Sequence, residues 1–250
     1  MQIKAVPFDL GLTLIRTAEI PKIYKRILET YGVRVSVDEV LKAYRANEKE
    51  FDVVEGQIEF GKDFWIKWNV KVLERLGIEE NREFLAKKID ELWWEHADLE
   101  VYPDVVETLV QLKAKGVKTG VVTNGLKSDF QQISRKLKLT DCFDVVVGVD
   151  TRNKGKPDRD IFLYALDKLR VHPKEAVFIG NSIKYDYEGA KRAGKPLVID
   201  REGETSKNVE TIRSLTEVLL YSKLISLIVF LTRPLDLSVY TLQDPTYLRK

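Results

Sequence analysis

Short apolar runs separated by helix-length stretches constrain the fold of this chain more than any other feature. The runs lie at the start of the chain and in its second half, and each run after the first follows a stretch long enough for a helix. This rhythm is typical of parallel strands joined by crossover helices, so we expect an α/β fold. The runs occupy residues 3–8, 118–123, 144–147, 176–179 and 196–199.

A segment without such runs interrupts the pattern between residues 17 and 97. Its apolar residues recur at three- and four-residue spacing, most clearly over residues 20–28, and this spacing is typical of amphipathic helices. We predict a bundle of about four helices, with breaks at Gly32, Gly56 and Gly77.

The inserted segment also contains all four tryptophans of the chain. Aromatic residues at helical spacing usually fill cores, so we expect most of them to pack helix against helix. A ligand pocket is the alternative. The four are Trp65, Trp68, Trp93 and Trp94.

Composition excludes several classes of protein. The 41 Lys and Arg residues against 39 Asp and Glu residues leave a net charge of +2, which provides no field to hold a polyanion, so nucleic acid is not an expected partner. A single cysteine, Cys142, cannot form an intramolecular disulfide. The first residues contain no long apolar signal region, and we therefore expect a cytoplasmic protein.

Polar residues gather where the predicted strands end. In sheets of this type ligands bind beyond the carboxyl ends of the strands, so the residues directly after each apolar run form one constellation of candidate site residues. The side chains at these positions are Asp9, Thr123, Asn124, Lys156, Asn181 and Asp186.

In order, spacing and strand context, these positions resemble the four motifs of the haloacid dehalogenase superfamily. The segment around Asp9 resembles the first motif, Thr123 the second and Lys156 the third. Residues 180–186 resemble the fourth, and the sequence after Asp186 continues the similarity. Four motifs in the right order are far more specific than any one of them.

The resemblance implies a Rossmann-like parallel-sheet core with an inserted helical-bundle cap of the family's first type. We expect residues 1–16 and 98–220 to form the core, and residues 17–97 the cap. Residues 221–250 form an apolar extension of unknown role, whose apolar stretch is shorter than the roughly 20 residues that span a bilayer. We expect it to pack on the core or against a second subunit, as in a homo-oligomer, rather than on a membrane.

Most members of this superfamily are magnesium-dependent phosphatases, and the resemblance implies a role for each site residue. Asp9 would attack the phosphate and become an aspartyl phosphate. Thr123 and the Asn124 N–H would bind a phosphoryl oxygen, and Lys156 would pair with both Asp9 and the phosphate. The implied Mg²⁺ ligands are Asp9, the backbone carbonyl of Gly11, Asn181 and Asp186.

Two positions depart from the phosphatase pattern. Family phosphatases carry a second Asp two residues after the nucleophile, as general acid and base, and here that residue is Gly11. Such acid–base help is worth typically 10²- to 10⁴-fold in rate. The first acidic residue of the fourth motif is here Asn181, whose neutral oxygen should bind the metal more weakly.

Three functions remain open on these residues. The leading expectation is a phosphatase of a small phosphorylated metabolite that acts on good leaving groups, such as acyl or aryl phosphates, or takes its acid from the cap. The second is a 2-haloacid dehalogenase, which needs neither metal nor second Asp. That group typically has a tyrosine where this chain has Gly11, and it uses a cap arginine to assist halide departure. The third is a catalytically weak relative that binds a phosphorylated metabolite or a protein partner.

Overall fold

The computed structural model describes residues 2–205 and 208–221. A six-stranded sheet with the order β5-β4-β1-β6-β7-β8 forms its centre, and every pairing in it is parallel. The predicted α/β fold with a parallel sheet is therefore confirmed. The strands are β1 (Ala5–Phe8), β4 (Lys118–Val122), β5 (Val145–Val147), β6 (Val177–Gly180), β7 (Lys195–Ile199) and β8 (Thr211–Ile212).

Sequence analysis did not predict three of the strands, because each has only two residues. One is β8 at the sheet edge. The other two are β2 (Ile15–Arg16) and β3 (Glu100–Val101), which pair antiparallel where the chain leaves the core and returns to it. A two-residue strand has no detectable period.

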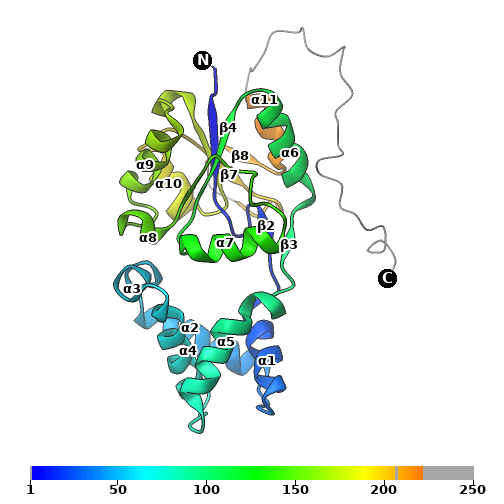
Figure 1. Cartoon of the computed structure of the whole chain (residues 1–250), viewed down its shortest axis with the longest axis vertical. Helices are drawn as coiled ribbons and strands as arrows, with labels where there is room; N and C mark the ends of the chain where they lie inside the picture. Colours follow the sequence, from blue (N-terminus) through cyan, green and yellow to red (C-terminus); the bar gives the residue numbers. More distant parts are fainter. Residues whose placement is uncertain (1, 206–207, 222–250) are drawn as a thin grey trace, which may run out of the picture.

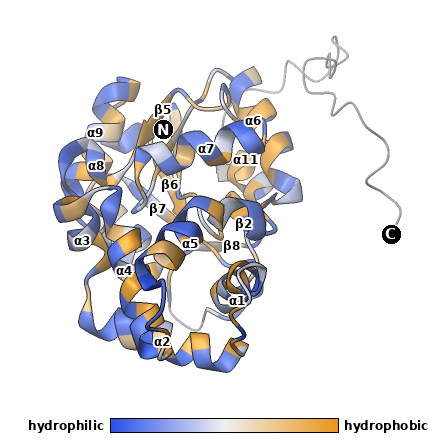
Figure 2. Ribbon diagram, turned by 60° about the horizontal axis from the view of Figure 1, so that its bottom comes forward, coloured by the Kyte–Doolittle hydropathy of each residue, from blue (hydrophilic) through white to orange (hydrophobic). Residues whose placement is uncertain are grey.

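Helices cover both faces of the sheet (Figure 1). On one face lie α6 (Pro103–Ala114) and α11 (Val218–Tyr221), and on the other α9 (Arg159–Leu169) and α10 (Glu188–Ala190). Successive strand residues point to opposite faces, so Val6 and Phe8 join one apolar cluster while Ala5 joins the other. Apolar and polar residues share each helix (Figure 2), and buried apolar residues include Val105 and Leu109 of α6 and Ile161 of α9.

Pro7 lies in the central strand β1, where a proline removes a donor from the ladder. Towards β4 the pairing is continuous over all four residues of β1. Towards β6 only Phe8↔Ile179 and a single bridge Ala5↔Ala176 are formed, so the ladder is interrupted around the proline. The strand stays central because β4 supplies the pairing that β6 lacks there.

The predicted helical cap is confirmed, with five helices instead of about four. They enclose a separate apolar core that includes Ile23, Ile27, Leu73 and Ile89, all of them fully buried. The predicted limits of the cap, residues 17 and 97, stay a prediction. The helices are α1 (Ile20–Thr30), α2 (Val37–Glu50), α3 (Val53–Phe60), α4 (Asp63–Arg75) and α5 (Arg82–His96).

One predicted helix break is wrong. Gly32 and Gly77 do follow the ends of α1 and α4, with φ of 77° and 71°, a region that favours glycine. Gly56 instead lies inside α3. A Cβ at position 56 would lie 2.1 Å from Cε2 of Phe64, so this glycine serves the close packing of α4 against α3.

The remaining core helices and turns lie near the carboxyl ends of the strands or connect the outer elements. Helix α7 runs between the sheet and the cap (Figure 1). No helix within the described residues is long and apolar enough to cross a membrane. The extension that we predict for residues 221–250 lies, beyond Tyr221, outside the described residues. These elements are α7 (Lys127–Lys136), α8 (Val149–Arg152), η1 (Pro173–Glu175), η2 (Ile183–Tyr187) and η3 (Leu215–Glu217).

An arginine clamp fixes the place where the chain returns from the cap to the core. Nη1 and Nη2 of Arg201 donate to the two carboxylate oxygens of Asp104 at 2.9 and 3.1 Å, and Nη2 also donates to the Thr13 carbonyl at 2.8 Å. The guanidinium lies 3.7 Å from the ring centroid of Tyr102. The clamp therefore joins the loop after β1 to the first turn of α6.

We predict that Asp104→Asn lowers the free energy of unfolding by about 2–3 kcal/mol at neutral pH, because it breaks a largely buried ion pair. Burial acts to raise the pKa of Asp104, but hydrogen bonds from Arg201 and its other donors together hold it below 3.8. The stabilisation is thus present above that pH and is lost as the pH falls through the lowered pKa. Urea titrations at several pH values measure this.

The matched control is Asp98→Asn, which removes an exposed pair with Arg26 and should cost less than about 1 kcal/mol. A loss in Asp104→Asn no larger than in this control would contradict the importance of the clamp.

Candidate active site

Three charged side chains converge beyond the carboxyl ends of β1 and β6. Nζ of Lys156 donates to Oδ1 of Asp9 at 2.5 Å and to Oδ1 of Asp186 at 2.6 Å. The exposed fractions of the three side chains are only 3%, 12% and 8%, in that order. Buried charges are stable only when paired, so one ammonium and two carboxylates hold three loops in one arrangement.

Strand ends place the two carboxylates. Asp9 directly follows β1, and its N–H donates to the carbonyl of Ile179 on β6 at 2.7 Å. Asp186 lies in η2, a single π-helical turn after β6, and its Oδ2 accepts the Ser182 N–H at 2.9 Å. A Cβ at Gly180 would lie 2.2 Å from Cγ of Asp186, so only glycine there lets this carboxylate reach the strand end.

The amide side chain of Asn124 positions the segment that carries Lys156. Its Oδ1 accepts the Lys156 N–H at 2.6 Å and its Nδ2 donates to the Lys156 carbonyl at 3.1 Å. Sequence reasoning considered only the backbone N–H of Asn124. Lys154, two residues earlier, pairs with Asp158 and Asp160 at the surface, so Lys156 alone of the two lysines reaches Asp9.

The other predicted site residues lie around this cluster. Thr123 directly follows β4, is 7% exposed, and its Oγ1 accepts the Gly125 N–H at 3.1 Å. Asn181 is half-buried at the start of the loop that leads to Asp186. Gly11 is exposed, and a Cβ built on it meets no atom within 4 Å.

Burial raises the pKa of Asp9 to about 6, with the neighbouring Asp186 adding to the rise and Lys156 opposing it. At neutral pH the side chain is therefore a carboxylate that has lost most of its hydration. Its Oδ1 is bound to Lys156, its Oδ2 has a 3.4 Å contact with the Thr13 hydroxyl, and the carboxylate also accepts the Leu10 N–H. Oδ2 is thus the oxygen with lone pairs left to attack an electrophile.

A cavity of about 330 Å³ lies between the core and the cap, beside the Asp9 loop. On the core side it begins at Leu10, Gly11 and Thr123. The cap contributes aromatic side chains to this cavity. We expected most tryptophans to pack helix against helix, and this holds fully only for Trp68, which is 2% exposed in the cap core. The other three pack at the edge of that core and also line the cavity. The aromatic cap residues of the lining are Tyr24, Tyr44, Trp65, Trp93 and Trp94.

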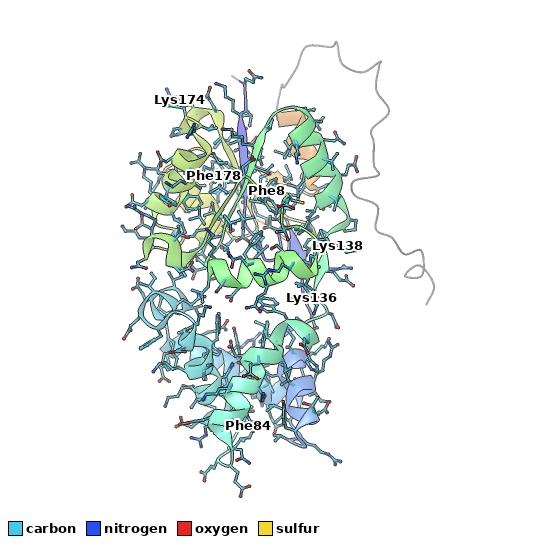
Figure 3. All side chains as sticks on the ribbon, viewed as in Figure 1. Phe8, Phe84, Lys136, Lys138, Lys174 and Phe178 are labelled. Carbon is cyan, nitrogen blue, oxygen red and sulfur yellow. The ribbon has the colours of Figure 1, made fainter. Side chains whose placement is uncertain are left out.

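Two contacts hold the cap against the core. Gln57 of α3 is 1% exposed, lines the cavity, and its Nε2 donates to the Asn124 carbonyl at 2.7 Å. Nζ of Lys136 on α7 donates to the Trp94 carbonyl on α5, and Figure 3 labels this lysine on the helix that faces the cap. Sequence reasoning missed both residues, because a polar residue on an amphipathic helix carries no sign of its tertiary partner.

Two further carboxylates, which sequence reasoning also missed, line the cavity from opposite sides. Asp129 belongs to the first turn of α7 and Asp90 to α5 of the cap. Burial raises the pKa of Asp129 to about 6, with the negative charges of Asp90 and Asp150 adding to the rise. The Leu126 N–H and Lys62 act in the opposite direction. Burial likewise raises the pKa of Asp90.

We predict that Asp129→Asn raises the free energy of unfolding above pH 6, by about 1–2 kcal/mol after allowance for solvent screening. A folded-state pKa of about 6 against an ordinary 3.8 means that the folded protein binds this proton more tightly. Wild type therefore loses stability as the pH rises through that interval, and the amide variant does not.

Denaturant titrations of wild type and Asp129→Asn between pH 5 and pH 8 measure the effect. The difference between their free energies of unfolding should become smaller towards pH 5. Asp141→Asn, at an exposed loop position, is the control. A constant difference across this range would show that Asp129 does not titrate as described.

Known proteins match this chain over most of its length. A family model described as a haloacid dehalogenase-like hydrolase matches residues 3–194. The glyceraldehyde 3-phosphate phosphatase of Methanopyrus kandleri is 29% identical over 204 residues, which cover 81% of this chain and 85% of that protein. The (S)-2-haloacid dehalogenase 1 of Pseudomonas sp. strain CBS-3 is 28% identical over 160 residues, 63% of this chain and 68% of that protein.

Among solved structures, a HAD phosphatase from Thermococcus onnurineus superposes with a TM-score of 0.61 at 30% identity, over 89% of this chain and 100% of that one. Fold, cap and family match together define a hydrolase with a parallel-sheet α/β core and a helical cap. The chain belongs to the haloacid dehalogenase-like hydrolase family, as its four motifs predicted.

Proposed function

We propose that this protein is a phosphatase that uses Asp9 as its nucleophile and acts in the cytoplasm on a small phosphorylated metabolite. The observation that carries the proposal is the convergence of Asp9, Lys156 and Asp186 beside a cavity that begins at Gly11 and Thr123. The phosphatases among the similar proteins support the same reaction class.

In the first step, Oδ2 of Asp9 forms a bond to phosphorus while the bond from phosphorus to the ester oxygen breaks. The products are an aspartyl phosphate and an alkoxide, which takes a proton from water because Gly11 carries no acid. In the second step a water oxygen bonds to phosphorus, the bond from phosphorus to Oδ2 of Asp9 breaks, and a proton of that water passes to the hydroxide left by the first step. Phosphate leaves, and the Asp9 carboxylate is restored.

The surrounding residues stabilise the phosphoryl group. The Lys156 ammonium is already hydrogen-bonded to Asp9 and would neutralise one phosphoryl oxygen. The Thr123 hydroxyl and the Asn124 N–H would donate to the others, since both residues follow β4 and Thr123 lines the cavity. Asn124 would serve a second purpose by keeping Lys156 in place.

The oxygen atoms at this site fit Mg²⁺, which prefers carboxylate and carbonyl oxygens. We propose Asp9, Asp186, Asn181 and the Gly11 carbonyl as its ligands. Only two of these are carboxylates, and no group of three or more His, Cys, Asp or Glu side chains able to hold a metal occurs within residues 2–205 and 208–221. We therefore expect weak binding. When bound, Mg²⁺ supplies positive charge to the phosphoryl oxygens.

We predict that Asp9→Asn reduces hydrolysis of acetyl phosphate and 4-nitrophenyl phosphate by about 10³-fold or more, because the amide is not a nucleophile. Release of inorganic phosphate with and without Mg²⁺ is the measurement. Asp98→Asn, at an exposed position, is the control and should retain activity. Equal residual rates in wild type and Asp9→Asn would favour the third expectation, a catalytically weak binder.

We predict that Gly11→Asp raises turnover of alkyl phosphates by about 10- to 10²-fold, because it restores a general acid to the leaving oxygen. The open space at the Gly11 Cβ position admits the side chain. Gly11→Asn has the same size but no acid, and should give no gain. A folded Gly11→Asp variant with an unchanged rate, or an equal gain with asparagine, would refute this role.

The dehalogenase alternative stands second. The resemblance to a haloacid dehalogenase and the loss of acid residues at positions 11 and 181 favour it. Among the described residues, however, no lysine or arginine lines the cavity. Arg16 and Arg26 pair instead with Glu100 and Asp98. Release of halide from 2-chloropropionate without metal would reverse the order of the two proposals.

A further inference from the structure

The cavity beside Asp9 has the chemistry of a binding site for the part of the substrate beyond the phosphate. It starts at the loop that follows the nucleophile and ends among the cap aromatics, so a phosphate near Asp9 would direct its ester group into it. Apolar cavities of about 150 Å³ hold benzene, and a volume of about 330 Å³ is therefore enough for a group of one or two rings.

The cavity lining is mainly apolar, and its cap side consists largely of aromatic rings. The Tyr24 hydroxyl donates a hydrogen bond to Oδ1 of Asn69 at 2.5 Å, and Nδ2 of Asn69 donates to the Ala86 carbonyl at 3.1 Å. Tyr24 also packs edge-to-face against Trp93, with ring centroids 5.5 Å apart. These contacts fix the rings in place and leave their apolar faces and edges for a ligand.

The charges along the cavity disfavour a second anionic group on the substrate. Within the described part of the chain, its lining contains no lysine or arginine, but it does contain Asp90 and Asp129 on opposite sides. A carboxylate or second phosphate placed there would be desolvated without a partner and repelled by both residues. The cavity therefore selects against phosphorylated acids and pyrophosphate.

The absence of an acid at Gly11 restricts the leaving group in a second, independent way. Without a proton donor the ester oxygen leaves as an anion, and the cost rises with the pKa of its conjugate acid. A phenol has a pKa of about 10, like the tyrosine side chain, whereas the pKa of an alkyl alcohol is far higher and close to that of water. Aryl esters thus depend least on the missing residue.

We propose, on the basis of the phosphatase function above, that the natural substrate is a phosphate monoester of an uncharged phenolic compound, whose ring occupies this cavity. Hydrolysis breaks the bond between phosphorus and the phenolic oxygen, and the phenolate takes its proton from water. Aromatic walls with two carboxylates would also suit an ammonium group, but an ammonium-bearing alkyl alcohol would be a poor leaving group at a site without an acid.

The test compares kcat/KM for phenyl phosphate, 2-naphthyl phosphate and 4-carboxyphenyl phosphate. The carboxyl group makes the phenol a better leaving group, so chemistry alone predicts faster hydrolysis of the third ester. The cavity predicts that it is slower by about 10-fold or more, chiefly through KM, and that the naphthyl ester reacts at least as well as the phenyl ester. Equal or faster hydrolysis of 4-carboxyphenyl phosphate, phosphoglycolate, pyrophosphate or phosphocholine overturns the proposal.

Substitutions of the two cavity carboxylates show whether their negative charge causes the preference for phenyl over 4-carboxyphenyl phosphate. Asp90→Asn and Asp129→Asn should each narrow the ratio between phenyl and 4-carboxyphenyl phosphate by about 3-fold or more, whereas the exposed Asp141→Asn should leave this ratio as in wild type. A ratio that neither cavity variant changes would show that these carboxylates do not select the substrate.

Failure of this inference is distinguishable from failure of the phosphatase function. Hydrolysis of acetyl phosphate that depends on Asp9 supports the function whatever the preference among aryl esters. If no phosphate ester is hydrolysed, calorimetry on Asp9→Asn decides the cavity's preference. Tighter binding of phenyl phosphate than of 4-carboxyphenyl phosphate upholds the preference for an uncharged ring, and the reverse order refutes it.

Discussion

The buried ammonium of Lys156 is the interaction on which the rest of the site depends. It is hydrogen-bonded to carboxylates from the loops after β1 and β6, and its own segment is held by the Asn124 side chain from the loop after β4. Loops that are distant in sequence meet because parallel strands bring their carboxyl ends to one edge. Removal of the ammonium would leave two buried carboxylates without their shared cation.

The proposed reacting residues lie in the core, whereas many of the residues that would contact the rest of the substrate lie in the cap. The core holds the proposed nucleophile Asp9, its partner Lys156 and the proposed phosphate-binding residues, whereas the cap supplies about half of the residues that line the cavity and most of its aromatic rings. Gln57 and Lys136 connect the two parts through hydrogen bonds to backbone carbonyls. Since the core carries no acid at Gly11, the proposed leaving group has to be one that the aromatic cap can bind and that departs without a proton.

Much of this arrangement was predictable from local patterns. The parallel strands, the helical insertion and the order of Asp9, Thr123, Lys156 and Asp186 all followed from residue type and spacing. The break proposed at Gly56 did not, because a glycine that ends a helix and one that admits a neighbouring ring look alike in sequence. The short strands β2, β3 and β8 have too few residues to show a period.

The sequence by itself determined the layered fold and the strand-end candidates Asp9, Lys156 and Asp186, since hydrophobic period and strand-end polar residues are local properties. Only the tertiary structure decided that three tryptophans face a cavity, that Asn124 holds Lys156, and that Asp90 and Asp129 lie on opposite sides of one space. The first and third of these facts depend on how the cap helices pack against the core, and the second depends on how two core loops meet. That packing is set by contacts between residues far apart in the chain, which no spacing within a single element encodes.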